Sequence, residues 1–159
     1  MSQSFRRGVR LALDWGDARI GVAASDPDGV LAYPAITVRA GTGEIDQLAA
    51  VVADYEPIEV LVGWPRSLSG GEGPAAAKAR ERAERLAGAI DVPVRLVDER
   101  LTTVTASQRL REGGKRAKEQ RALIDAAAAV AILEQALAFE QSQEKPAGEL
   151  VSGNPHPSQ

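Results

Sequence analysis

Residues 8–26, GVRLALDWGDARIGVAASD, form the stretch that most limits what this chain can fold into. Apolar residues occupy every second position up to Asp14, which is the period of a strand with two distinct faces. Residues 15–18 then predict a turn, in which Gly16 is free to adopt a positive φ. Residues 19–25 have the pattern of the return strand. The stretch therefore predicts a β-hairpin with a carboxylate, Asp14, at the end of its first strand, where functional groups of α/β folds usually gather.

Few residue types are available for catalysis. The chain has 159 residues and no cysteine, which excludes disulfides, thiolate catalysis and cysteine zinc sites. Its one histidine, His156, lies in a polar stretch, so a Ser-His-Asp triad or a histidine metal site is not expected. Carboxylates, lysine and arginine side chains, and hydroxyls remain. No apolar run is long enough to span a bilayer, and the first residues resemble neither a signal peptide nor a membrane anchor.

The remaining elements predict an α/β fold in which helical crossovers follow the hairpin. Right-handed crossovers would place the last two strands parallel to the first. The result is a mixed five-stranded sheet, three antiparallel strands plus two parallel, with helices on both faces, which is the ribonuclease H-like layout. The elements expected after the hairpin are a strand at 30–38 that Pro34 makes an edge strand or a broken one, helices at 44–55, 75–89, 103–112 and 122–140, and strands at 58–63 and 92–97.

The periodic pattern stops shortly after the last of these helices. We therefore expect residues 1–140 to form one ribonuclease H-like domain with its own core. Residues 141–159 are rich in Pro, Gly and Ser and predict a disordered C-terminal tail.

Carboxylates at two further places are candidates for a site with Asp14. Asp125 is followed in its predicted helix only by alanines at the next turn, so it would be pressed against the sheet; the alternative is an acid that merely complements the helix dipole. Asp98 and Glu99 end the last predicted strand, and strand alternation allows only one of them to point at the site. Converging carboxylates without His or Cys favour a hard cation, Mg²⁺ or Mn²⁺, which could activate water for phosphodiester hydrolysis.

Four segments together resemble the YqgF family, also called RuvX, of pre-16S ribosomal RNA nucleases, which are RuvC-like members of the ribonuclease H-like superfamily. They are spread over most of residues 8–140 and are specific only in combination. The segments are LALDWGDARIGVAASD (11–26), LVGWPRSLSGGEG (61–73), VRLVDERLTT (94–103) and IDAAAAVAIL (124–133).

The resemblance implies a cytoplasmic, metal-dependent nuclease that trims the 5′ end of precursor 16S rRNA. It also implies that Asp14, Glu99 and Asp125 are the catalytic residues and the metal ligands. Many relatives in the wider superfamily place their second acid at the end of the fourth strand, where this chain has residues 63–65, Gly-Trp-Pro. The second acid must therefore come from the segment 98–100, with Glu99 preferred over Asp98.

Basic side chains surround the predicted site and are candidates for contacts with nucleic acid. Residues 100–121 hold seven basic side chains and two acidic ones in a chain of net charge −3. The alternative interpretation is an ordinary solvated helix face. The candidates for phosphate contacts are Arg19, Arg66, Arg100, Lys115, Arg116 and Lys118.

The substrate is left open by the sequence. A structured RNA such as precursor rRNA, ribosome-bound or free, and branched DNA are both compatible, so a Holliday-junction resolvase is the nearest alternative. A non-catalytic RNA-binding scaffold and a nucleotide-binding domain of the actin and sugar-kinase type are further alternatives, since one fold serves several functions. The oligomeric state is not predicted.

Overall fold

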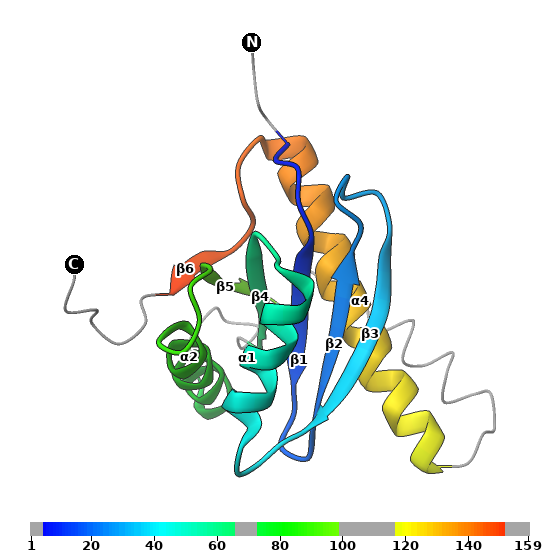
Figure 1. Cartoon of the computed structure of the whole chain (residues 1–159), viewed down its shortest axis with the longest axis vertical. Helices are drawn as coiled ribbons and strands as arrows, with labels where there is room; N and C mark the ends of the chain where they lie inside the picture. The colour runs from blue at the N-terminus through cyan, green and yellow to red at the C-terminus, as the bar shows by residue number, and fades with distance from the viewer. Residues whose placement is uncertain (1–4, 66–72, 99–116, 152–159) are drawn as a thin grey trace.

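A computed structural model describes residues 5–65, 73–98 and 117–151 of the chain. Its centre is one six-stranded sheet with the strand order β3-β2-β1-β4-β5-β6 (Figure 1). The strands are β1 (Arg10–Trp15), β2 (Arg19–Ser25), β3 (Ala32–Arg39), β4 (Glu59–Trp64), β5 (Val94–Asp98) and β6 (Glu149–Val151).

The predicted hairpin is present and occupies the middle of the sheet. β1 and β2 pair antiparallel, with Leu13 opposite Val22. The turn is closed by a hydrogen bond of 2.9 Å from the Gly16 amide to the Arg19 carbonyl oxygen. Gly16 is not among the glycines with positive φ, so its role is to leave space. A Cβ at this position would lie 2.9 Å from that same carbonyl oxygen, closer than real Cβ atoms approach.

β3 is an edge strand, as Pro34 predicted. It pairs antiparallel with β2, and the register shifts between Val22 and Ala23, where Pro34 lies opposite Ala23. A proline has no N–H to donate to a neighbouring strand. It is therefore tolerated at a bulge in an edge strand, which has a neighbouring strand on one side only.

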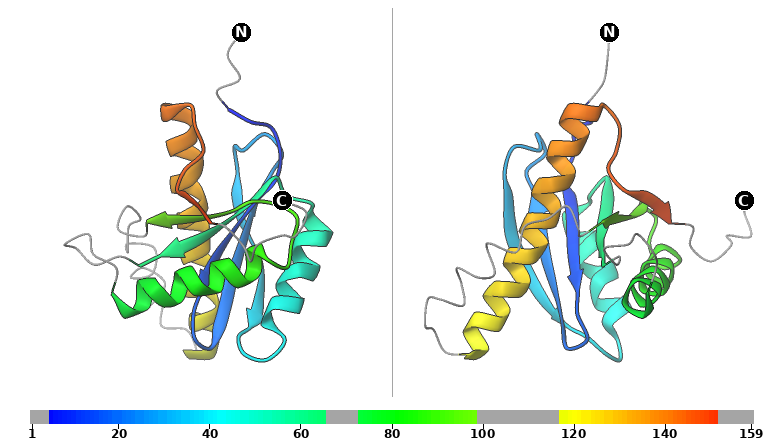
Figure 2. Two further views of the ribbon diagram at one scale, coloured as in Figure 1. Left: turned by 90° about the vertical axis from the view of Figure 1, so that its left-hand side faces the viewer. Right: turned by 180° about the vertical axis from the view of Figure 1, so that it is seen from behind.

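β4 and β5 continue the sheet parallel to β1, which confirms the predicted crossovers. The crossover helices α1 (Glu44–Tyr55) and α2 (Pro74–Ala87) cover one face of the sheet. The long helix α4 (Ala117–Gln143) covers the other face, as the two turned views show (Figure 2). The helix expected at 103–112 lies outside the described residues.

Two apolar clusters form the core, one on each face of the sheet. Leu11 and Leu13 of β1 belong to the cluster beneath α1 and α2, together with Leu86 of α2. Ala12, which points to the opposite face, belongs to the cluster beneath α4, together with Ala129. The alternation along β1 therefore places residues 10, 12 and 14 on the α4 face.

The prediction that the chain becomes disordered from residue 141 is wrong for its first part. α4 continues to Gln143, and β6 pairs antiparallel with β5 as a sixth strand, with Val151 opposite Val94. Gly148 permits this close pairing, because it has a φ of 83° and a Cβ there would overlap the backbone oxygen of Leu96. A strand of three residues has no periodicity of its own, so only its pairing with β5 reveals it.

None of the helices in the described part of the chain is both long and apolar enough to cross a bilayer.

Candidate functional site

Asp14 lies at the carboxyl end of β1, on the face of the sheet that α4 covers. Its partner across the hairpin is Gly21, which has no side chain to occupy the space beside the carboxylate. Asp14 is half-buried, whereas Ala12 and Ala23 on the same face are fully buried. The carboxylate is therefore held at the rim of a closely packed layer, where it can be reached from outside.

Small residues on both sides allow α4 to lie close to the sheet near Asp14. Ala12, Ala23 and Ala129 share one core cluster, and all three are 0% exposed. The backbone of α4 places position 125 four residues, or about one helical turn, before Ala129. The predicted helix-on-sheet packing is thus present, while the side chain of Asp125 lies outside what the structure describes.

The second strand end supplies Asp98, and the structure places this residue on the opposite face from Asp14. Asp98 is the last residue of β5 and lies opposite Trp64 in the sheet. Leu96, two residues earlier, belongs to the cluster beneath α1 and α2, and alternation assigns Asp98 to the same face. Glu99 lies outside the described residues.

No group of three potential metal ligands is present among the residues that the structure describes. Of the three predicted ligands, Asp14 alone has a side chain within the described part of the chain. An oxygen donor at a strand end beside a glycine fits a hard cation such as Mg²⁺. β4 ends in Gly63 and Trp64, so it adds no acid to the site.

A cleft opens next to Asp14, between the hairpin turn and α2. Its volume is about 450 Å³. Small residues form much of its wall, among them Gly16, Gly63 and Ala79. The cleft therefore borders the end of β1 that carries Asp14, on the side of the sheet that α2 covers.

Three charged residues at the rim of this cleft were not among the predicted site residues: Asp17, Lys78 and Arg82. The Oδ1 atom of Asp17 lies 3.1 Å from Lys78 Nζ and accepts a hydrogen bond of 2.8 Å from Arg82 Nη2. The hydrogen bonds from Arg82 and Lys78 lower the pKa of the Asp17 carboxyl. The i, i+4 spacing of the two bases on α2 is visible in the sequence, but their partner on the hairpin appears only in the fold.

Asp26, which has a sequence context similar to that of Asp14, has a different role. Its Oδ1 atom accepts hydrogen bonds from the backbone amides of Val30 and Leu31, at 2.8 Å and 2.9 Å. These hydrogen bonds, that from Leu31 above all, lower the pKa of the Asp26 carboxyl. Asp26 therefore stabilises the turn between β2 and β3, as expected of a turn residue.

The predicted nucleic-acid contacts are largely beyond the described part of the chain. Arg19 begins β2 and shares the α4 face with Asp14, because Ile20 lies on the other face. Lys118 belongs to the first turn of α4, although its side chain is not described. The other four predicted contacts, Arg66, Arg100, Lys115 and Arg116, lie outside the described residues.

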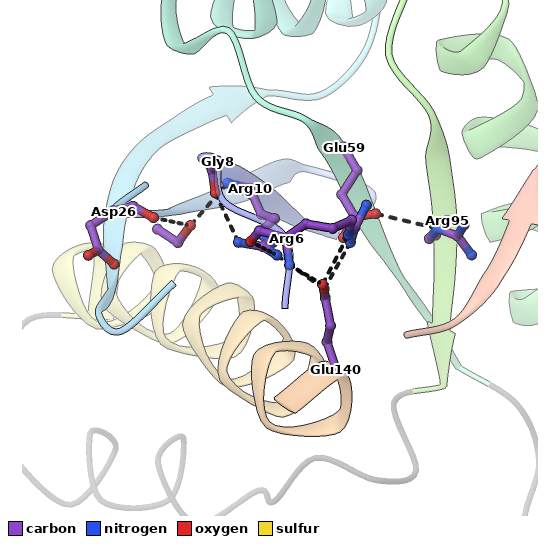
Figure 3. Close-up of polar contacts among 8 residues, drawn as sticks. Arg6, Gly8, Arg10, Asp26, Glu59, Arg95 and Glu140 are labelled. Carbon is purple, nitrogen blue, oxygen red and sulfur yellow. Dashed lines mark hydrogen bonds and ion pairs between the residues drawn. The ribbon is translucent and has the colours of Figure 1, made fainter. Parts of the chain in front are cut away.

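Figure 3 shows a buried ionic network. Its residues Arg10 and Glu59 begin β1 and β4, so the network lies at the other end of these strands from Asp14. Glu140 of α4 accepts hydrogen bonds from Arg6 Nη2 at 2.8 Å and from Arg10 Nη2 at 3.2 Å. Arg6 also pairs with Glu59 of β4 at 3.0 Å, and Glu59 pairs in turn with Arg95 of β5 at 3.4 Å. Burial opposes the charge of Glu140, but the hydrogen bonds from Arg6 and the charge of Arg10 outweigh it and lower the pKa of Glu140 to about 2.

The fold is RuvC-like and belongs to the ribonuclease H-like class. The RuvC of T. thermophilus, solved in complex with a Holliday junction substrate, superposes with a TM-score of 0.50 at 17% identity, over 90% of this chain and 99% of that one. This likeness shows the fold.

The chain belongs to the RuvX family, whose model, described as Holliday junction resolvase, matches residues 8–139. A protein of Streptomyces coelicolor with the name "Putative pre-16S rRNA nuclease" is 60% identical over 149 residues, which cover 92% of this chain and 89% of that protein. A protein of Thermobifida fusca with the same name is 54% identical over 158 residues, or 94% of this chain and 99% of that one. The family that the four sequence segments predicted is thereby confirmed.

Proposed function

We propose that this nuclease hydrolyses phosphodiester bonds in precursor 16S rRNA, in the cytoplasm, with a divalent cation bound by Asp14, Glu99 and Asp125. The observation that carries the proposal is the position of Asp14. It lies at the carboxyl end of the central strand, opposite Gly21 and on the face that α4 covers, and α4 is the helix that holds position 125. The names of the relatives from Streptomyces and Thermobifida support the choice of rRNA.

The assignment of Glu99 rather than Asp98 has support from the sheet. Asp98 follows Leu96 on the face that α1 and α2 cover, whereas Asp14 is on the other face. A strand that continued in the same alternation would bring its next residue to the side of Asp14. This favours Glu99 as the second carboxylate.

Each part of the proposed site has a defined task. A bound Mg²⁺ or Mn²⁺ would supply an activated water and neutralise charge on the phosphate. The three carboxylates would hold the cation at the sheet end. Arg19, which shares the α4 face, and the basic side chains of Arg66, Arg100, Lys115, Arg116 and Lys118 would hold the phosphates of the substrate.

A cleavage assay tests the proposal directly. Fragments of precursor 16S rRNA should be cut in the presence of Mg²⁺ or Mn²⁺, and cleavage should stop when EDTA is in excess. Cleavage that continues undiminished in EDTA would contradict the metal-dependent mechanism.

The description of the RuvX family and the RuvC complex favour a second candidate, a resolvase that acts on four-way DNA junctions. The same assay, with a four-way DNA junction in parallel, separates the two. Preferential cleavage of the junction would replace the rRNA assignment, and binding of RNA without cleavage of either substrate would indicate a scaffold.

A further inference from the structure

The rim of the cleft carries a charged cluster that the proposed metal site does not use. Asp17 lies in the hairpin turn, three residues after Asp14. Lys78 and Arg82 lie one helical turn apart on α2 and reach the same atom, Asp17 Oδ1, at 3.1 Å and 2.8 Å. Two cationic donors from one helix therefore converge on one anionic oxygen.

The two ends of this cluster differ in how firmly they are held. Arg82 donates a second hydrogen bond of 3.0 Å to the Trp15 carbonyl oxygen, and its guanidinium lies 5.9 Å from the centre of the Trp15 ring. Its side chain is only 16% exposed, whereas that of Asp17 is 79% exposed. Arg82 is thus fixed in place independently of Asp17, and the carboxylate is the member that can be exchanged.

A phosphodiester group has the chemistry to replace that carboxylate. Like a carboxylate, it carries one negative charge shared by two oxygens that accept hydrogen bonds from lysine and arginine. The cleft in front of the cluster, about 450 Å³ in volume, is lined by Asp14 as well as by Lys78 and Arg82. The cleft thus runs from the end of β1 that carries Asp14 to α2, and a nucleic-acid strand that lies along it would bring a phosphate beside Lys78 and Arg82.

We propose that Lys78 and Arg82 form a phosphate-binding site for the nucleic-acid substrate, and that the Asp17 carboxylate occupies this site in the free protein. The proposal rests on the proposed nuclease function for the identity of the ligand. Substrate binding then exchanges one anion for another. In the free protein Asp17 neutralises the two cations, and it lowers the affinity for any phosphate that must displace it.

Binding measurements in EDTA test the site without cleavage. The probe is a fluorescein-labelled single-stranded fragment of precursor rRNA, and fluorescence anisotropy gives its Kd over a series of KCl concentrations. Lys78→Ala combined with Arg82→Ala should weaken binding by about tenfold and reduce the slope of log Kd against log salt by about 0.7, the value for one phosphate contact on a single strand. Lys78→Ala alone, at an exposed position that cannot disturb the core, should give a smaller weakening in the same direction.

Arg85→Ala is the matched control. Arg85 lies on the same helix, is 51% exposed, and pairs with Glu44 rather than with a residue of the cleft. Its removal should leave the salt slope unchanged. If the variants at Lys78 and Arg82 bind like Arg85→Ala, the cluster is an ordinary surface ion pair and the inference is overturned.

Asp17→Asn should have the opposite sign and tighten RNA binding several-fold, because the competing carboxylate is gone. Unchanged or weaker binding by Asp17→Asn would overturn the proposed exchange. These outcomes are separable from those of the cleavage assay. Intact cleavage with no effect at Lys78 and Arg82 contradicts this inference alone, while the predicted binding changes without any metal-dependent cleavage contradict the proposed function alone.

Discussion

Asp14 is the described residue on which the proposed chemistry depends, and its position follows from its neighbours. The strand alternation puts it on the α4 face, and Gly21 across the hairpin leaves the space beside it open. Asp26 has a similar sequence context, but its carboxylate accepts hydrogen bonds from two backbone amides. The two aspartates therefore make a matched pair for mutation.

Asp14→Asn should lower the cleavage rate by more than about 100-fold, because a lost metal ligand costs at least as much as a lost partner of such a ligand. It should also abolish the rise in Tm that Mg²⁺ or Mn²⁺ produces in the unmodified protein, since a ligand stabilises only the state that binds it. Thermal unfolding with and without metal measures the second effect. Asp26→Asn should retain both cleavage and the metal response, and an Asp14→Asn variant that behaves the same way would contradict the site.

The close approach of α4 to the sheet depends on alanines that face one another. Ala129→Leu should lower the free energy of unfolding by about 1–3 kcal/mol, because extra methylene groups have no space in this layer. It should also weaken the metal-induced rise in Tm by moving the helix away from Asp14. Ala138→Leu, at an exposed position of the same helix, is the control and should change neither quantity. Equal effects of the two substitutions in urea unfolding would show that the packing is not tight.

The sequence predicted the elements whose signal is local and missed those that depend on a partner far away in the chain. Alternation in residues 8–26 predicted the hairpin, and Pro34 predicted the edge strand. β6 was not predicted, because three residues are too few to show the alternating pattern of a strand. Its strand conformation comes from pairing with β5. Likewise, the sequence showed Lys78 and Arg82 one turn apart on α2, but their shared contact with the distant Asp17 appears only in the fold.

The pairing of β6 provides its own test through Gly148. Gly148→Ala should lower the free energy of unfolding by more than Gly43→Ala, although the two glycines have similar φ values of 83° and 85°. Both variants incur the cost of a left-handed alanine, about 1 kcal/mol. Only at Gly148 would the new Cβ also overlap the Leu96 backbone, since the nearest atom to a Cβ at Gly43 is 4.0 Å away. Equal losses in urea unfolding would contradict the observed position of β6.

The two ends of the sheet carry different features, the candidate site at one end and the ionic network at the other. The carboxyl ends of β1 and β4 border the cleft and Asp14, whereas the amino ends of the same strands carry Arg10 and Glu59 of the ionic network. α4 spans both ends, since Glu140 in its last turns joins that network. The network thus fixes the helix at one end while the other end of the helix carries position 125.

The network makes the stability of the whole fold depend on pH through Glu140. The pKa of this buried carboxyl is lowered from 4.5 to about 2 in the folded protein. The group therefore contributes stability above its unfolded pKa, and this contribution is lost as the pH falls through the folded value. Glu140→Gln should lower the free energy of unfolding near neutral pH by about 3 kcal/mol, because it leaves Arg6 and Arg10 without their charged partner.

The difference between Glu140→Gln and the unmodified protein should shrink as the pH falls from about 6 toward about 2, because the carboxyl takes up a proton in the unfolded chain near pH 4.5 but in the folded protein only near pH 2. Urea unfolding across this range measures it. Glu134→Gln, an exposed position on the same helix, should show little difference at any pH. A difference for Glu140→Gln that stays constant with pH would mean that the side chain acts by its shape and hydrogen bonds, and that the charge of the network does not hold α4 in place.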